Sequence, residues 1–180
     1  IMAVSHHAQV IQDYFKDRYL NIPVVYSNEN KPLGTGGAIA RAMQMVEEKS
    51  TVILNGDTYF PVDLNKLKHS HSKSKNDISI AVKLMYEFDR YGTVEMDRTH
   101  RITDFNEKTY TDKGYINGGT YIINKSVFKG YTADIPFSLE KEIFEQKVRS
   151  LKISAFRSKA GFIDIGIPEE YERIQSMRLK

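Results

Sequence analysis

The stretch KPLGTGGAIARAM, residues 31–43, places three glycines and a threonine in front of an apolar-periodic helix. The run IPVVYS (22–27) before it is β-branched and aromatic, which predicts a strand. A strand followed by a glycine turn and a helix is typical of α/β folds. Glycines at such a turn indicate that some group approaches the backbone closely.

The alternation of strand and helix patterns continues on both sides of this stretch. We expect strands at 1–5, 22–27, 51–57, 77–84, 92–96, 101–106, 118–124, 151–156 and 161–165, the first of them buried. The strands at 92–96 and 101–106 would form a hairpin, and the alternation in 77–84 predicts a strand with one buried face. We expect helices at 6–20, 36–48, 64–71, 137–146 and from Pro168 onward. Ser138 is the expected N-cap of the fourth helix, and Lys141 three residues later excludes a capping box. The pattern predicts one α/β domain over 1–180 with a mixed sheet.

Composition excludes several classes of protein. The 180 residues are 27% charged and 41% hydrophobic, which is ordinary for a globular domain. The absence of cysteine excludes disulfides and thiolate metal sites, and we expect a cytoplasmic location. No apolar run approaches the roughly 18 residues of a membrane span. The net charge is only +3, and the basic tract 66–75 lacks aromatic residues, so we expect neither a membrane nor a nucleic acid as partner.

The glycine turn fits neither standard phosphate-binding pattern. A Walker-type loop needs a lysine and a hydroxyl after its last glycine, but Gly37 is followed by Ala-Ile-Ala. The dinucleotide fingerprint needs a third glycine where Ile39 stands. Two interpretations remain open: a base or ribose edge meets the backbone at 33–37, or the glycines form a tight turn that binds nothing.

Two aspartates follow or lie within apolar strands. Asp57 ends LNGD (54–57), at the carboxyl end of a predicted strand, where ligands collect in open α/β sheets. Asp164 lies inside FIDIG (162–166), and a carboxylate is costly to bury without a partner. If the two converge, they form a hard oxygen site suited to magnesium. Alternatively, Asp57 forms a turn or cap and Asp164 accepts backbone amides.

Two further stretches carry polar residues near strand ends. In FNEK (105–108), Glu107 and Lys108 would point to opposite faces of a strand. Lys108 is then a phosphate contact at a cleft rim, or the two form a surface ion pair. In INGG (116–119), Asn117 and the bare backbone after it suit hydroxyl recognition, and equally a plain turn.

Together these motifs resemble the sugar-1-phosphate nucleotidyltransferases over essentially the whole chain. The matching motifs are LGTGGA (33–38), NGD (55–57), RYGTV (90–94), FNEK (105–108), INGGTY (116–121), FSLE (137–140) and FIDIGIPEEY (162–171). DRYGTVEMD and GYINGGTYII bring the chain nearest to guanylyltransferases that act on D-glycero-D-manno-heptose 1-phosphate. Mannose-1-phosphate guanylyltransferases come next.

The resemblance implies a single Rossmann-like nucleotidyltransferase domain with a mixed, mostly parallel sheet flanked by helices. It implies an enzyme that joins a sugar 1-phosphate to a nucleoside triphosphate, with GTP and heptose 1-phosphate favoured, and leaves a homodimer open. Nucleotide contacts would come from Leu33, Gly34, Thr35, Gly36 and Gly37. Magnesium would be held by Asp57 and Asp164, and Lys108 would contact the sugar phosphate. The sugar would be lined by Tyr91, Gly92, Glu107, Asn117 and Gly118, where any Cβ at Gly118 should crowd the sugar ring.

The chain departs from the family pattern at its front. The family opens with a strand and a glycine-rich G-x-G-T-R-type loop that grips the triphosphate, and neither precedes the strand at 1–5. We therefore expect an N-terminally incomplete domain whose 180 residues turn over little or nothing on their own. Other interpretations are another NDP-sugar pyrophosphorylase, a non-catalytic nucleotide- or sugar-phosphate-binding member, and an unrelated α/β nucleotide-binding domain.

Overall fold

The computed structural model describes residues 1–132 and 134–177, whose contacts divide the chain into two compact units. Unit 1 comprises Ile1–Lys49 and Phe128–Lys147. Unit 2 comprises Ser50–Val127 and the segment that begins at Val148. The expectation of one domain over the whole chain stays a prediction.

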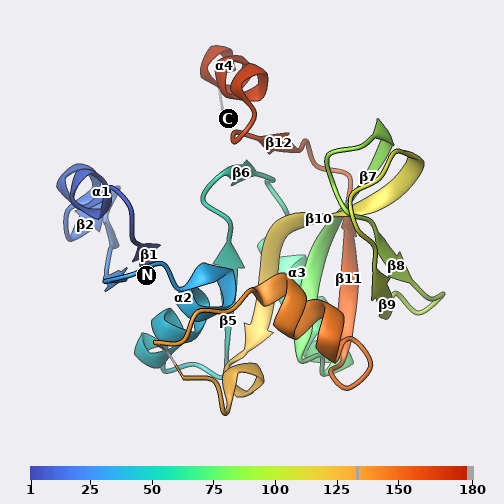
Figure 1. Cartoon of the computed structure of the whole chain (residues 1–180), viewed down its shortest axis with the longest axis horizontal. Coiled ribbons are helices and arrows are strands. Elements are labelled where there is room, and N and C mark those ends of the chain that lie inside the picture. Colours follow the sequence, from blue (N-terminus) through green and yellow to red (C-terminus); the bar gives the residue numbers. More distant parts are fainter. Residues whose placement is uncertain (133, 178–180) are drawn as a thin grey trace. The chain divides into compact units, whose positions relative to one another are not determined.

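Within the described residues, unit 2 is built on a four-stranded mixed sheet (Figure 1). Its strands are β5 (Ser50–Leu54), β7 (Ile78–Phe88), β10 (Thr111–Asn124) and β11 (Ile153–Ser158). The order is β11-β7-β10-β5, in which β11 is parallel to β7 and β10 is antiparallel to both β7 and β5. Three strands therefore share one direction and β10 opposes them, which confirms the expected mixed sheet.

The first half of β7 is buried on both faces, although its alternation predicted one buried face. Every residue from Ile78 to Val82 is buried. Helix α3 (Leu64–Ser74) covers the second face and packs its fully buried Leu67 into a cluster with Ala81. Burial of a leucine side chain stabilises a fold by about 1.5–3 kcal/mol. Covered strands of this kind read as continuous apolar runs, which explains why alternation alone underestimated the burial.

A buried polar network joins α3 to three strands of the sheet. His71 Nδ1 lies 2.9 Å from Ser79 Oγ, and its Nε2 lies 3.2 Å from Asn124 Oδ1. Asn76 donates to Ser79 Oγ at 3.0 Å and accepts from Ser154 Oγ at 3.0 Å. Because buried polar groups are costly without partners, this network fixes how α3 sits on the sheet.

Three smaller elements complete unit 2. A two-stranded ribbon forms from β6 (Thr58–Tyr59) and β12 (Ile163–Asp164), which run antiparallel. The expected hairpin is confirmed as β8 (Val94–Met96) paired with β9 (Ile102–Phe105). The expected final helix is confirmed as α4 (Pro168–Ser176), with Pro168 and two glutamates in its first turn.

Unit 1 contains short strands and helices. In chain order they are β1 (Met2–Val4), α1 (Ala8–Phe15), β2 (Arg18–Tyr19), β3 (Ile22–Pro23), β4 (Tyr26–Asn28), α2 (Gly34–Ala42), the 3₁₀ turn η1 (Met43–Met45) and the π-helical segment η3 (Leu139–Glu145). Among the described residues, β1 pairs in parallel with β4 only, and of its own residues only Val4 is buried, so the expectation of a buried strand was too strong. The helix expected at 6–20 ends at Phe15, because the chain turns through positive φ at Lys16 and forms the β2–β3 pair.

The N-cap expected for the helix at 137–146 is confirmed, and Lys141 completes no capping box, as expected, but Glu142 makes a reciprocal bond in its place. Ser138 Oγ accepts the Lys141 N–H at 3.2 Å. The Glu142 carboxylate reaches back to the Ser138 N–H at 2.8 Å. The reciprocal pair is therefore shifted by one residue, in keeping with the wider π-helical turn that follows.

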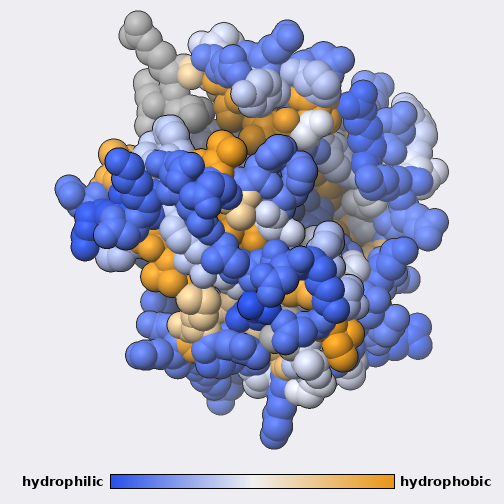
Figure 2. Space-filling model, turned by 60° about the vertical axis from the view of Figure 1, so that its left-hand side comes forward, coloured by the Kyte–Doolittle hydropathy of each residue, from blue (hydrophilic) through white to orange (hydrophobic). Residues whose placement is uncertain are grey.

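Exposed apolar side chains gather in residues 10–25 of unit 1. They include Leu20, 79% exposed, and Val10, Tyr14 and Ile22, each about two-thirds exposed. On the face shown in Figure 2, hydrophobic residues form separate patches within a mostly hydrophilic surface. Of the helices in residues 1–132 and 134–177, none has the length and apolar character needed to cross a membrane.

Candidate functional site

The glycine turn, Leu33–Gly37, opens helix α2 and binds a neighbouring segment of the chain. Gly34 adopts a φ of 69°, which favours glycine. The N–H groups of Gly36 and Gly37 both donate to the Phe137 carbonyl, at 3.0 and 3.3 Å. Two of the first four N–H groups of the helix are therefore satisfied within the protein.

The same segment makes the close approach that the glycines indicate. A Cβ on Gly36 would lie 2.2 Å from the Phe137 ring, and one on Gly34 would lie 2.7 Å from the Phe137 carbonyl oxygen. A Cβ on Gly37 would lie 3.0 Å from the Ile135 carbonyl oxygen. Packing against residues 135–137 thus explains the glycines without a ligand, and nucleotide binding at Leu33–Gly37 stays a prediction.

The Thr35 side chain is also engaged within unit 1. Its hydroxyl donates to Glu140 Oε2 at 2.7 Å and accepts the Leu139 N–H at 2.9 Å. These bonds tie the start of α2 to the start of η3. Thr35 therefore has a structural role in holding these two elements together, independently of any contact with a nucleotide.

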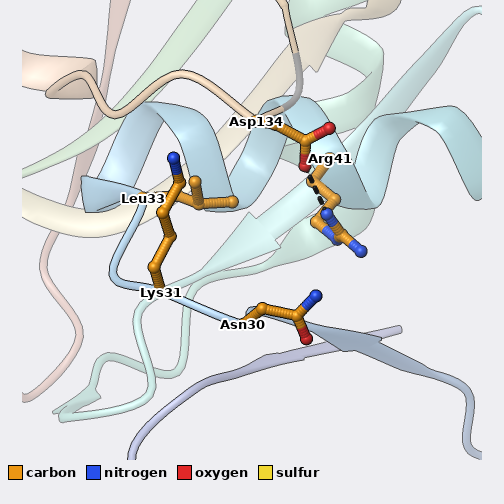
Figure 3. A pocket seen from close by; sticks show the side chains of 5 residues that line it. All are labelled: Asn30, Lys31, Leu33, Arg41 and Asp134. Atoms are coloured by element: carbon orange, nitrogen blue, oxygen red, sulfur yellow. Dashed lines mark hydrogen bonds and ion pairs between the residues drawn. The ribbon is translucent and has the colours of Figure 1, made fainter.

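A hollow of about 410 Å³ lies beside the glycine turn in unit 1 (Figure 3). Its lining residues are Asn30, Lys31, Leu33, Arg41 and Asp134. Arg41 and Asp134 form an ion pair at 2.6 Å, drawn as a dashed line in Figure 3. Of the five residues expected to contact a nucleotide, Leu33 is the one that lines this hollow. The hollow offers amide and ammonium donors beside a carboxylate acceptor, a set that suits a polar ligand.

The acidic ribbon, β6 and β12 with the turn residue Asp57, holds both expected metal ligands. The Ile165 N–H donates to the Asp57 carbonyl at 2.9 Å, and Asp164 pairs directly with Thr58. The Thr58 hydroxyl donates to Asp57 Oδ1 at 3.3 Å. Asp57 and Asp164 therefore occupy neighbouring positions of one short ribbon, although 107 positions separate them in sequence.

Both Asp164 carboxylate oxygens accept hydrogen bonds. Oδ1 accepts the Gly166 N–H at 3.0 Å, and Oδ2 accepts the Tyr91 hydroxyl at 3.1 Å. Partial burial and then the Asp164 charge raise the pKa of Tyr91 to about 12, so its hydroxyl stays protonated near neutral pH. The Gly166 bond is of the kind expected if Asp164 accepts backbone amides. The Asp57 side chain, in contrast, is exposed.

The donor set of the ribbon fits a hard divalent cation whose other ligands come from elsewhere. The described residues contain no cluster of three or more His, Cys, Asp or Glu side chains that could hold a metal. Magnesium is usually bound through one or two carboxylates together with substrate phosphates and water. The two aspartates of this ribbon would supply the protein carboxylates of such a site, and the phosphates and water would supply its other ligands.

The residues expected to line a sugar are linked to this ribbon within unit 2. Tyr91 bonds to Asp164, and a Cβ on the next residue, Gly92, would lie 2.4 Å from the Asn106 carbonyl oxygen. Thr93 bridges to Ile116 in β10, immediately before Asn117. A chain of contacts thus runs from the ribbon to the middle of β10.

β10 is irregular where the sugar contacts are expected. Its register with β7 shifts between Asn117 and Tyr121, and Asn117 Oδ1 accepts the Gly119 N–H at 3.0 Å. A Cβ on Gly118 would lie 2.4 Å from the Phe60 ring and 2.8 Å from the Ala81 carbonyl oxygen. Core packing therefore requires glycine at 118, whether or not a sugar ring lies near its backbone. Bulges of this kind are common next to active sites.

The strand-based argument for Glu107 and Lys108 was wrong. Strand β9 ends at Phe105, so both residues lie in the exposed segment after it and the two-faced alternation does not apply. Lys108 makes no hydrogen bond or ion pair to another described residue, so the surface ion-pair alternative is not met. Its ammonium is available to an anion.

Sequence reasoning missed two structural partners of these residues. The FSLE motif (137–140) belongs to the family pattern, yet only the fold shows that Phe137 fills the space left by the glycines. Lys83 of β7 donates to the Ala160 carbonyl at 2.6 Å and so anchors the chain that leads into β12. For Lys83, the available sequence signal was a lysine within a mostly apolar strand.

Comparison with known proteins supplies the family. The chain matches the nucleotidyl transferase family model over residues 1–179. It is 44% identical over 175 residues to the D-glycero-alpha-D-manno-heptose 1-phosphate guanylyltransferase of Aneurinibacillus thermoaerophilus, which covers 97% of this chain and 76% of that protein. Its Campylobacter jejuni counterpart is 44% identical over 95% of this chain and 75% of that protein.

A solved structure agrees with this assignment. HddC from Yersinia pseudotuberculosis, complexed with GMP-PN, matches with a TM-score of 0.84 at 37% identity, over 95% of this chain and 74% of that one. Nucleotidyltransferases of this family generally use a divalent metal. The resemblance drawn from the motifs is thereby confirmed: the chain belongs to the nucleotidyl transferase family.

Proposed function

We propose that this protein transfers the guanylyl group of GTP to D-glycero-α-D-manno-heptose 1-phosphate, giving GDP-heptose and pyrophosphate. The observation that carries the proposal is the 44% identity, over 97% of this chain, to a relative of that name. The acidic ribbon supports it, because Asp57 and Asp164 lie at neighbouring backbone positions there.

In the reaction, a phosphate oxygen of the sugar 1-phosphate attacks the α-phosphorus of GTP. A new P–O bond forms as the bond from the α-phosphorus to the β-phosphate oxygen breaks, and pyrophosphate leaves with that electron pair. No general base is needed, since the attacking phosphate is already ionised near neutral pH. The work of the protein is to position the anions in line and to offset their charge.

The residues take their roles from this chemistry. Asp57 and Asp164 would hold Mg²⁺, which when bound neutralises charge on the phosphate oxygens. Lys108, exposed and unpaired among the described residues, contacts the sugar phosphate. Backbone and side chains of Leu33, Gly34, Thr35, Gly36 and Gly37 contact the base and ribose. The sugar is lined by Tyr91, Gly92, Glu107, Asn117 and Gly118. The cytoplasmic location and the homodimer stay predictions.

A substrate screen of the natural full-length protein tests this function. GTP, dTTP, CTP and UTP are each combined with heptose, mannose and glucose 1-phosphates in the presence of Mg²⁺, and pyrophosphate release is followed. We expect the highest kcat/KM for GTP with the heptose 1-phosphate. Binding of GTP without pyrophosphate release from any pair would instead support a non-catalytic member, and a preference for another pair would overturn the substrate assignment.

A further inference from the structure

The Asp164 carboxylate is held at both of its oxygens, whereas the neighbouring Asp57 is exposed. Oδ1 is fixed by the Gly166 N–H at 3.0 Å, a contact made within its own turn. Oδ2 is fixed by the Tyr91 hydroxyl at 3.1 Å, a contact that comes from 73 residues away. The backbone bond constrains Oδ1, and the Tyr91 bond adds a second constraint at Oδ2.

The Tyr91 ring is itself packed in place. It meets Phe162 edge to face, with centroids 5.8 Å apart and planes at 88°, and it lies 6.4 Å from the Phe88 ring. Phe162 in turn meets Phe60 of the core at 5.7 Å. Aromatic pairs in this geometry restrict ring motion, so the hydroxyl has a defined direction.

The segment that carries Asp164 is anchored from a third side. Lys83 Nζ donates to the Ala160 carbonyl at 2.6 Å, just before Phe162. The ring, the anchored segment and the Gly166 amide thus surround one carboxylate. This arrangement is the kind of outer support that orients metal-binding carboxylates in proteins.

We propose that Tyr91 is a positioning residue that orients the Asp164 carboxylate toward a divalent cation shared with Asp57. The inference rests on the metal site in the proposed function. It adds to the sugar-lining position of Tyr91 a separate role for its hydroxyl, whose proton is given to Asp164, so that only acceptor lone pairs remain for a sugar hydroxyl. Loss of the hydroxyl should therefore weaken the cation site first and sugar binding little.

The test uses ¹⁵N-labelled full-length protein titrated with Mn²⁺ alone, and it follows the paramagnetic broadening of the Gly166 amide signal. Tyr91→Phe removes the hydroxyl and keeps the ring. We expect it to raise the Mn²⁺ concentration for half-broadening about 10-fold or more, because loss of such supporting contacts costs about 10–100-fold in metal affinity. Tyr86→Phe, at an exposed position of β7, is the matched control and should behave as wild type. Thermal unfolding of each variant checks that the fold is kept.

Two companion measurements separate the possible outcomes. If Asp164→Asn leaves Mn²⁺ broadening unchanged, the metal site of the proposed function fails, and the role of Tyr91 fails with it. If Asp164→Asn weakens Mn²⁺ binding but Tyr91→Phe does not, only the positioning role is overturned. In the second measurement, a 10-fold rise in the KM for sugar 1-phosphate in Tyr91→Phe, with Mn²⁺ binding unchanged, would assign Tyr91 to the sugar instead.

A double variant adds an independent check. Because Tyr91 is inferred to act through the Asp164 carboxylate, Tyr91→Phe should have no further effect on Mn²⁺ binding in the Asp164→Asn background. Additive losses in the double variant would contradict the inference.

Discussion

The glycine turn and the acidic ribbon were both predicted to contact a ligand, but the two regions differ in whether other residues of the chain occupy that place. In the glycine turn, the space and two N–H groups that the motif offers are occupied by residues 135–137 of the same unit. In the acidic ribbon, Asp57 remains exposed, and Asp164 is oriented by Tyr91 and Gly166. A glycine motif indicates a close approach without identifying what approaches, whereas Asp57 presents an exposed carboxylate to which a cation or a donor can still bind.

The largest effect is expected at the exposed aspartate. Asp57→Asn keeps the shape of the side chain and removes its charge, so the proposed cation site would lose one of its two carboxylates. We expect kcat of the natural full-length protein to fall about 1,000-fold, equivalent to about 4 kcal/mol of transition-state stabilisation. Pyrophosphate release measures it, and Asp112→Asn, at an exposed position of β10, serves as the control. Near-normal activity of a folded Asp57→Asn protein would rule out its metal role.

A smaller effect, on stability, is expected in the glycine turn. Gly36→Ala would drive a Cβ to within 2.2 Å of the Phe137 ring, and such overpacking costs about 1–3 kcal/mol. Gly56→Ala is the matched control, because a Cβ there meets no atom within 4 Å. Urea unfolding measures both changes.

A second background sharpens the comparison. In a Phe137→Ala protein the ring is gone, so Gly36→Ala should cost less than half of what it costs in the wild type. An equal cost in both backgrounds would mean that something other than Phe137 requires the glycine.

The smallest effect is a pH dependence at Tyr91. Its pKa is raised to about 12 in the folded protein against 10.0 ordinarily, so its contribution to stability is fully present below pH 10 and is lost as the pH rises toward 12. The free energy of unfolding should therefore fall more steeply between pH 10 and 12 in the wild type than in Tyr91→Phe. Parallel curves for the two proteins would show that folding does not raise the pKa of the Tyr91 hydroxyl.

Much of the fold was predictable because its signals are local. Hairpin β8–β9, the Ser138 cap and the start of α4 at Pro168 each depend on a few adjacent residues, and all three are confirmed. The mixed sheet followed from the alternation of strand and helix patterns. The neighbouring positions of Asp57 and Asp164 were expected from the family resemblance, because the two apolar strands alone left their convergence open.

What the sequence did not predict depends on contacts between distant segments. The fit of Phe137 against Gly36 joins residues about a hundred positions apart, and the network around His71 draws on α3 and three strands. Glu107 was misplaced because the strand pattern runs beyond Phe105 while the hydrogen-bonded pairing does not. Strand boundaries depend on the partner strand, which periodicity in one segment does not reveal.

The central claim is that Asp57 and Asp164 hold one cation together. A crystal of the natural full-length protein with GTP and Mn²⁺, measured at the manganese absorption edge, tests it most directly. The account predicts an anomalous peak at about 2.1 Å, the usual distance for a small divalent cation, from one carboxylate oxygen of each aspartate. A manganese peak bound to the phosphates alone, with either aspartate beyond contact distance, would contradict it.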